Sequence, residues 1–133
     1  METVEIYFDG GCWPNPGPKG CWKYLICVGS KVYENADWIE QKDCTNNIAE
    51  YEGLLHALEK ATELNLKDVV IYGDSNLVVQ QINRRWKIKK DYLLEYAIIC
   101  WKLLRKLNSW KLQWIPREQN IDADDLYNER HQQ

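Results

Sequence analysis

Four acidic residues of this 133-residue chain stand where helices and strands are expected to begin or end. Asp9 closes the alternating run in "VEIYFDGG", and Asp74 closes the apolar run in "VVIYGDS". Glu50 falls one turn into the helical pattern "TNNIAEYEGLL", on its inward side, and Asp124 falls in the first turn of a helix beginning in "NIDADDLY". Because ligands of open α/β sheets bind at the carboxyl ends of the strands, these carboxylates could meet at one edge.

Each acid also has a purely structural explanation. Asp9 before two glycines is typical of a turn, and Asp74 before Ser75 is a good helix cap. Glu50 and Asp124 could be solvated residues near helix N-termini, where negative charge is favoured. Four converging carboxylates, however, would raise one another's pKa and destabilise the fold unless a cation neutralised them. An all-oxygen set favours Mg²⁺ or Mn²⁺, so the pattern indicates a divalent-metal site.

The hydrophobic periodicity predicts the elements that would position these acids. Three antiparallel strands come first, then a helix capped by Thr45, a buried strand, two helices, a strand and a last helix from about Asp122. The expected ranges are 3–9, 20–29 and 31–40, then 45–64, 69–72, 74–82, 92–107 and 111–116. Right-handed crossovers make the later strands parallel. We therefore expect one α/β domain over residues 1–133, with a mixed five-stranded sheet (three antiparallel strands plus two parallel) and helices on both faces.

Composition excludes several classes of protein. Apolar residues make up 45% of the chain, with seven tryptophans and eight tyrosines, so a packed domain is expected. The five cysteines are odd in number and form no C-x-x-C pair, which favours reduced thiols over disulfides or zinc. No run is long enough to span a bilayer, and the N-terminus does not resemble a signal peptide. We expect a cytoplasmic monomer with no membrane partner.

The charge pattern bears on a nucleic-acid partner. The net charge of −3 argues against one, but "RRWKIKK", residues 84–90, carries five positive charges around Trp86. Such a run is usually a solvated face, although a basic segment with an indole also suits strand binding. Metal neutralisation of the four acids would bring the net charge to +1.

Four segments together resemble type 1 ribonuclease H in order and spacing: "YFDGGCWPNPGPKG", "TNNIAEYEGLLHAL", "YGDSNLVVQQI" and "REQNIDADDL". The resemblance runs from Val4 to Leu126. It implies a ribonuclease H-like fold and hydrolysis of the RNA strand of an RNA/DNA hybrid to 5′-phosphate and 3′-hydroxyl ends. It also implies Asp9, Glu50, Asp74 and Asp124 as catalytic ligands of two Mg²⁺ ions, with Mn²⁺ as a substitute.

The resemblance also implies which residues would contact the substrate. Neutral amides would read the RNA 2′-hydroxyl in the minor groove, the first helix start would hold a DNA phosphate, and basic residues would grip the strands. The candidates are Cys12 (through its backbone), Asn15, Thr45, Asn46, Asn47, Asn76, Trp86, Lys87, Lys89, Lys90 and Arg117. Turns and caps explain the Asn and Thr residues equally well, and Arg117 could instead pair with Glu118 or Asp122.

Two departures from the family pattern leave alternatives open. Only residues 84–90 stand where many relatives carry a basic protrusion, and "IPREQN" is too short for the usual histidine loop, so the chain resembles the compact branch of the family. The two histidines are His56 in the first helix, where a packing or surface position is expected, and His131 in the tail, which could swing toward the site. The two departures leave open a hybrid- or RNA-binding module with little catalysis. A second alternative is a resolvase- or integrase-like nuclease, which also uses clustered carboxylates. Duplex RNA is a further candidate substrate.

Overall fold

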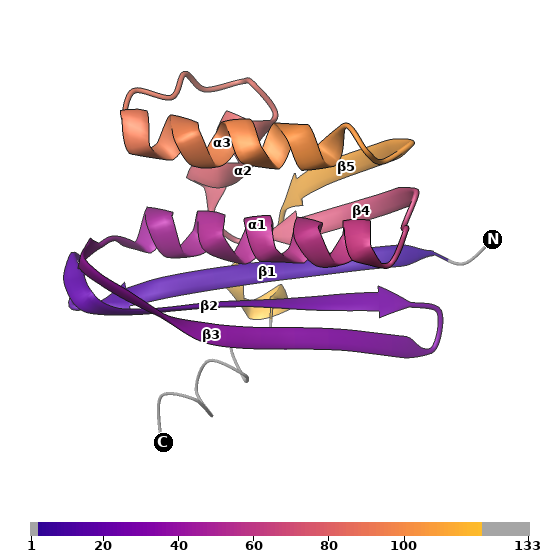
Figure 1. Ribbon diagram of the computed structural model, residues 1–133, viewed down its shortest axis with the longest axis horizontal. Coiled ribbons are helices and arrows are strands. Elements are labelled where there is room, and N and C mark those ends of the chain that lie inside the picture. Colours follow the sequence, from indigo (N-terminus) through magenta and orange to yellow (C-terminus); the bar gives the residue numbers. More distant parts are fainter. Residues whose placement is uncertain (1–2, 121–133) are drawn as a thin grey trace.

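The computed structural model describes residues 3–120, which form one five-stranded sheet with strand order β3-β2-β1-β4-β5 (Figure 1). The strands are β1 (Val4–Trp13), β2 (Gly17–Val28), β3 (Lys31–Cys44), β4 (Asp68–Gly73) and β5 (Ser109–Trp114). The helices are α1 (Asn46–Glu63), α2 (Asn76–Ile82) and α3 (Asp91–Leu104), followed by the short 3₁₀ turn η1 (Arg117–Gln119). Strands β1, β2 and β3 pair antiparallel, and β4 pairs parallel with both β1 and β5. The predicted mixed sheet is confirmed.

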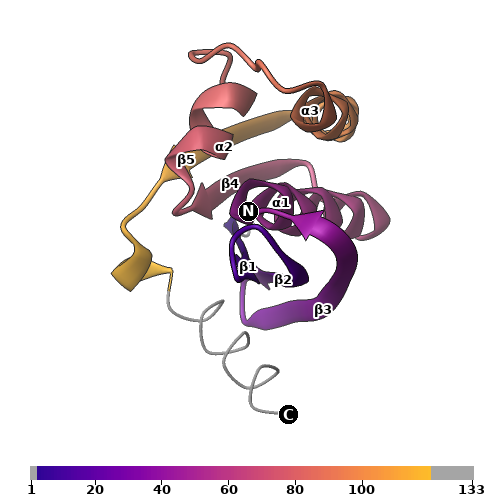
Figure 2. The same cartoon turned by 90° about the vertical axis from the view of Figure 1, so that its left-hand side faces the viewer.

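The three described helices pack on one face of the sheet. Ile6 and Phe8 of β1, Ile71 of β4 and Leu112 of β5 belong to the same buried cluster as the inner faces of α1, α2 and α3. Figure 2 shows α1 and α3 on the same side of the curved sheet. The last helix, expected from about Asp122 and needed to cover the second face, lies outside the described residues.

The first hairpin is longer than the sequence predicts. Strand β1 does not end at Asp9 but continues through Gly10 and Gly11 to Trp13, which pairs with Lys19. A Cβ at Gly10 would lie 2.2 Å from the backbone oxygen of Ala49, so α1 rests directly on this strand. Close approach of the helix therefore explains the glycine at position 10, and Asp9 lies within a strand rather than in a turn.

Helices α1 and α3 begin at the same end of the molecule. Each precedes a strand in a crossover and runs opposite to it, so each begins near the carboxyl ends of β4 and β5. The Thr45 side chain caps α1, with its Oγ1 accepting from the Ile48 N–H at 3.2 Å, as predicted. Residues 83–90 link α2 to α3 without a further helix, which confirms that the basic protrusion is absent from this segment.

The expectation of fully reduced cysteines is wrong. Cys12 near the end of β1 and Cys44 at the end of β3 form a disulfide, with their Cα atoms 6.2 Å apart. The pair is 32 residues apart in sequence and meets only because β2 brings both neighbours alongside: a Cβ at Gly20 would contact both sulfurs. Cys21, Cys27 and Cys100 are free thiols.

None of the helices described between residues 3 and 120 combines the length and apolar character needed to cross a bilayer.

Candidate metal centre

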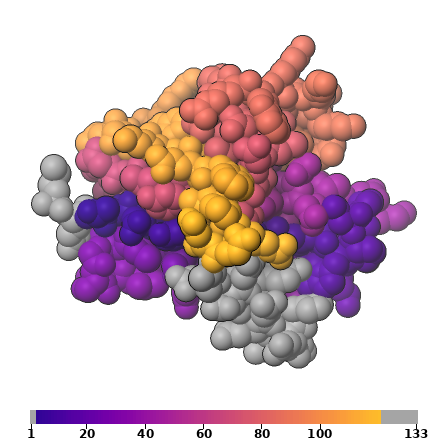
Figure 3. All heavy atoms as spheres, turned by 180° about the vertical axis from the view of Figure 1, so that it is seen from behind, coloured from indigo at the N-terminus to yellow at the C-terminus, as the bar shows by residue number. Residues whose placement is uncertain are grey.

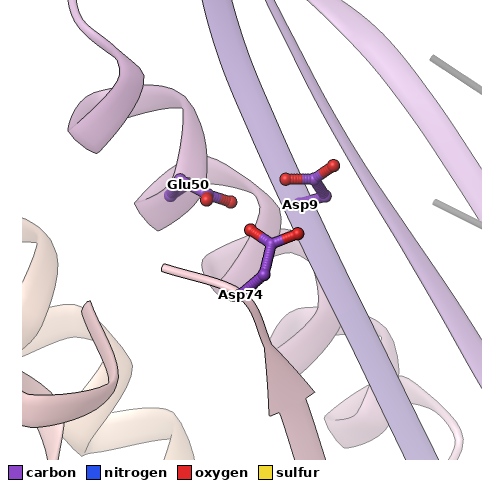
Figure 4. A group of neighbouring side chains, drawn as sticks. All are labelled: Asp9, Glu50 and Asp74. Atoms are coloured by element: carbon purple, nitrogen blue, oxygen red, sulfur yellow. The ribbon is translucent and has the colours of Figure 1, made fainter. Parts of the chain in front are cut away.

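Three of the four predicted carboxylates converge at the carboxyl edge of the sheet. Asp9 lies on β1, Asp74 follows β4, and Glu50 projects toward both from the first turns of α1 (Figure 4). One carboxylate oxygen from each residue lies within 4.8 Å of the others. Asp9 and Glu50 are 8% and 7% exposed, and Asp74 is half-buried. The fourth predicted ligand, Asp124, lies outside the described residues, as do Asp122 and His131.

Local structure explains how each acid reaches this edge. Asp74 does not cap α2, because Ser75 does so, its Oγ accepting from the Val78 N–H at 3.3 Å. The Asp74 side chain is therefore available to the cluster. Glu50 lies on the same helical stripe as the buried Leu54 and Ala57, so it points inward as the sequence predicts.

The electrostatics of the cluster centre on Glu50. Burial raises the pKa of its carboxyl group well above the ordinary value, and the neighbouring charges of Asp9 and Asp74 raise it further. Its Oε1 atom is buried and accepts no hydrogen bond in the described structure. A buried acceptor that faces two other carboxylates is the arrangement that a cation would satisfy.

Asn120, just after η1, contributes to the cluster and was missed as a site residue from the sequence. Its side chain is 1% exposed, and its Nδ2 donates to the backbone oxygen of Phe8 at 3.0 Å and to Asp74 Oδ2 at 3.2 Å. The amide therefore ties Asp74 to β1. Figure 3 shows the yellow segment that follows β5 lying across the back of the molecule. Asn120 opens the "N-x-x-AD-x-L" block of the sequence, which was the available signal.

The residues present fit a divalent cation. All three clustered donors are oxygens, which suit Mg²⁺ or Mn²⁺ rather than zinc. A cavity of about 310 Å³ opens over them, and its wall also includes Gly11, Cys12, Asn46 and Arg117. The arrangement can hold a hard cation and present it to an anionic group entering the cavity.

Two of the predicted nucleic-acid residues, Cys12 and Asn46, line this cavity beside the first hairpin, and Asn15 contacts Asn46. Asn46 Oδ1 accepts from the Cys12 N–H at 2.9 Å, and Asn15 Oδ1 accepts from the Asn46 N–H at 3.1 Å. These two bonds join the first hairpin to the start of α1. The side-chain oxygens of Asn15 and Asn46, two of the amides predicted to contact RNA, therefore have structural roles, and Asn47 is half-buried.

The other predicted contacts are more scattered. Asn76 is exposed at the start of α2, where its Oδ1 accepts from Gln80 Nε2 at 3.1 Å. Arg117 lies on the wall of the carboxylate cavity. Trp86, Lys87, Lys89 and Lys90 are exposed in the segment between α2 and α3, outside that cavity.

His56 packs rather than joins the cluster. Its ring stacks on Trp22 with centroids 3.9 Å apart, and its nitrogens lie 3.0 Å from Glu52 and 3.4 Å from Glu59. The predicted packing role is confirmed.

Comparison with known proteins gives a consistent result. A family profile described as "Reverse transcriptase-like" matches residues 27–130. The Ribonuclease HI of Halobacterium salinarum is 36% identical over 127 residues, a match that covers 95% of this chain and 63% of that protein. The chain thus spans less than two thirds of that relative's length.

Solved structures extend the likeness to the whole fold. The N-terminal ribonuclease H domain of Rv2228c from Mycobacterium tuberculosis superposes with a TM-score of 0.89 at 33% identity, covering 97% of this chain and 93% of that one. LC11-RNase H1, solved in complex with an RNA/DNA hybrid, gives a TM-score of 0.84 at 30% identity and covers 93% of each chain.

Proposed function

Since this chain belongs to the ribonuclease H family, we propose that it is a metal-dependent endoribonuclease that hydrolyses the RNA strand of RNA/DNA hybrids. The observation that carries the proposal is the convergence of Asp9, Glu50 and Asp74 within 4.8 Å at the carboxyl edge of the sheet. A relative of the same fold has been solved with a hybrid bound, which supports this substrate class. The expected products carry 5′-phosphate and 3′-hydroxyl ends.

The chain's carboxylates would hold the metal. Asp9, Glu50 and Asp74 supply oxygen ligands, and we propose Asp124 as the fourth. When bound, two Mg²⁺ ions, or Mn²⁺ in their place, supply activation of water and stabilisation of the leaving oxygen. Glu50 must lose its proton to serve as a ligand, so its raised pKa couples metal binding to proton release.

Neighbouring residues would orient the site and the substrate. Asn120 fixes the Asp74 carboxylate through its 3.2 Å hydrogen bond. Arg117 places a positive charge on the cavity wall, where it would attract the phosphate to be cleaved. The proposed reaction needs no nucleophilic side chain, because water is the attacking group in metal-assisted hydrolysis.

Selection of RNA would depend on the rim between the first hairpin and α1. Asn15 and Asn46 present amide groups there, beside the Cys12 backbone, and a 2′-hydroxyl can both donate to and accept from such groups. Asn47 and Asn76 are proposed to extend this contact. The N-terminus of α1 at Thr45 would take a phosphate of the DNA strand.

The experiment is cleavage of an end-labelled RNA/DNA hybrid with Mg²⁺ and separately with Mn²⁺, beside duplex RNA, duplex DNA and the Asp74→Asn variant. We expect cuts only in RNA paired with DNA, and none by the variant. Cleavage of duplex RNA as well would widen the substrate class. Hybrid binding without cleavage in either metal would favour a binding module, and cleavage of duplex DNA would favour a resolvase-like nuclease.

Cytoplasmic location and a monomeric state stay predictions.

A further inference from the structure

A lysine is buried beside the candidate metal centre. Lys23 on β2 is 0% exposed and ranks among the largest fully buried side chains of the described chain. Lysine is almost never fully buried unless its charge is compensated, because removing an ammonium group from water is costly. Its presence inside this protein therefore calls for nearby negative charge.

The sheet register places an acidic residue next to Lys23. Lys23 is directly opposite Asp9 in the antiparallel pairing of β1 with β2. Side chains of directly opposed residues share a face of the sheet, with Cβ atoms about 5 Å apart. Asp9 is thus the immediate cross-strand neighbour of the lysine.

Helix packing confirms which face the pair occupies. A Cβ at Gly53 of α1 would lie 2.5 Å from the Asp9 backbone oxygen and 3.1 Å from that of Lys23. The helix therefore presses on the backbones of both residues, and the adjacent Trp22 stacks on His56 of α1. Because side chains alternate along β2, Lys23 points to the opposite face, as Asp9 does.

We propose that Lys23 is a positioning residue whose ammonium group partly neutralises the carboxylate cluster through Asp9 and thereby sets the affinity of the site for divalent ions. The inference rests on the proposed function, since it assigns a role within that same centre. Two effects follow from one charge. In the metal-free protein the ammonium offsets repulsion among Asp9, Glu50 and Asp74, and during metal binding it opposes the incoming cation.

A structural role alone explains the residue less well. A buried strand position would normally carry an apolar side chain, whereas the loss of one partner from a buried charge pair is destabilising. If Lys23 only filled space, methionine, which is unbranched and adaptable, would serve as well. The charge itself is therefore the property to test.

The experiment compares wild type with Lys23→Met and with the control Lys31→Met, which removes an exposed charge at the far end of β2 and β3. Mg²⁺ and Mn²⁺ affinities are measured by calorimetry without nucleic acid, and the melting temperature is measured with and without each metal. For Lys23→Met we expect about tenfold tighter metal binding, a lower metal-free melting temperature and a larger stabilisation by metal. Lys31→Met should match wild type in all three.

Equal metal affinities in wild type and Lys23→Met would overturn the proposal, as would weaker binding by the variant. If Lys23→Met fails to fold, the wild-type protein still decides: Mn²⁺ should broaden the NMR signals of the Lys23 side chain at concentrations that leave those of Lys31 unchanged. Absence of that difference would overturn the proposal. Because neither readout involves cleavage, an inactive protein with the expected metal response would contradict the proposed function and leave the role of Lys23 standing.

Discussion

At the scale of a single residue, the Asp9 carboxylate is subject to two opposing electrostatic effects. A carboxylate oxygen of Asp9 lies within 4.8 Å of those of Glu50 and Asp74, which disfavour its charge, whereas the ammonium group of Lys23 on the opposed strand favours it. We predict that Asp9→Asn abolishes hybrid cleavage and lowers the metal-free melting temperature, because the buried ammonium group of Lys23 loses its cross-strand carboxylate. Calorimetric melting and the cleavage assay check this, with the exposed Asp37→Asn as control. An unchanged or higher melting temperature would show that repulsion within the carboxylate cluster outweighs the attraction between Asp9 and Lys23.

The raised pKa of Glu50 predicts that the free energy of unfolding of the metal-free protein depends on pH. The pKa of Glu50 in the folded protein lies well above its ordinary value of 4.5. At pH values between the two, the folded state therefore binds more protons than the unfolded state. The free energy of unfolding should therefore decrease as pH rises through this window. Urea denaturation at a series of pH values measures the slope, and Glu50→Gln should flatten it. An identical slope in the variant would show that another group titrates.

Residue types alone could not reveal every member of the site. Asp74 was recognised, but only the structure shows that Ser75 takes the capping role. Asn120 stood in a recognised block, yet its function depends on contact with Phe8 and Asp74, far away in sequence. Lys23 carried no signal, because its proximity to Asp9 follows from the strand register.

Helix α1 depends on a close approach at the scale of elements. Gly53 lets the helix lie against β1, since a Cβ would come 2.5 Å from the Asp9 backbone oxygen. Although alanine favours helix formation, we predict that Gly53→Ala destabilises the protein by about 1–3 kcal/mol, because backbone must shift. Urea unfolding measures the loss. The exposed Glu63→Ala in the same helix is the control, and equal stabilities would contradict the close packing.

The link between Cys12 and Cys44 joins β1 to β3 just before α1 begins. Closing a loop of this length is expected to stabilise the fold by about 3–4 kcal/mol in the chain-entropy account. We predict that reductant lowers the free energy of unfolding by that order and has no effect on Cys12→Ser/Cys44→Ser. Alkylation of the unreduced, denatured protein should label three of its cysteines. Labelling of all five would contradict the disulfide.

Periodicity predicted the elements better than their limits. The order of strands and helices followed from hydrophobic patterns, whereas β1 runs past Asp9 because packing under α1 overrides the low strand preference of Gly10. The cysteine pair was missed for a related reason. Odd count and spacing describe the chain, but contact between Cys12 and Cys44 is created by the sheet.

The charge distribution matters at the scale of the whole molecule. Although the net charge is −3, the exposed basic segment 84–90 precedes α3 at the end of the molecule where α1 begins. We predict that hybrid binding weakens steeply with salt, and that Lys87→Gln/Lys89→Gln reduces the slope of log affinity against log salt by about two. Fluorescence anisotropy with the Asp74→Asn protein, which should bind without cleaving, measures the slope. Lys31→Gln serves as control, and an unchanged slope would exclude this segment from the interface.

The measurement that tests the metal centre most directly is anomalous diffraction from crystals of the wild-type protein soaked in Mn²⁺. The expected result is an anomalous peak bonded to carboxylate oxygens of Asp9, Glu50 and Asp74, at about 2–2.3 Å. The same soak of Asp74→Asn crystals should weaken or remove that peak. A wild-type map with no peak at these residues, or with a peak only elsewhere, would contradict the assignment of this cluster as the metal centre.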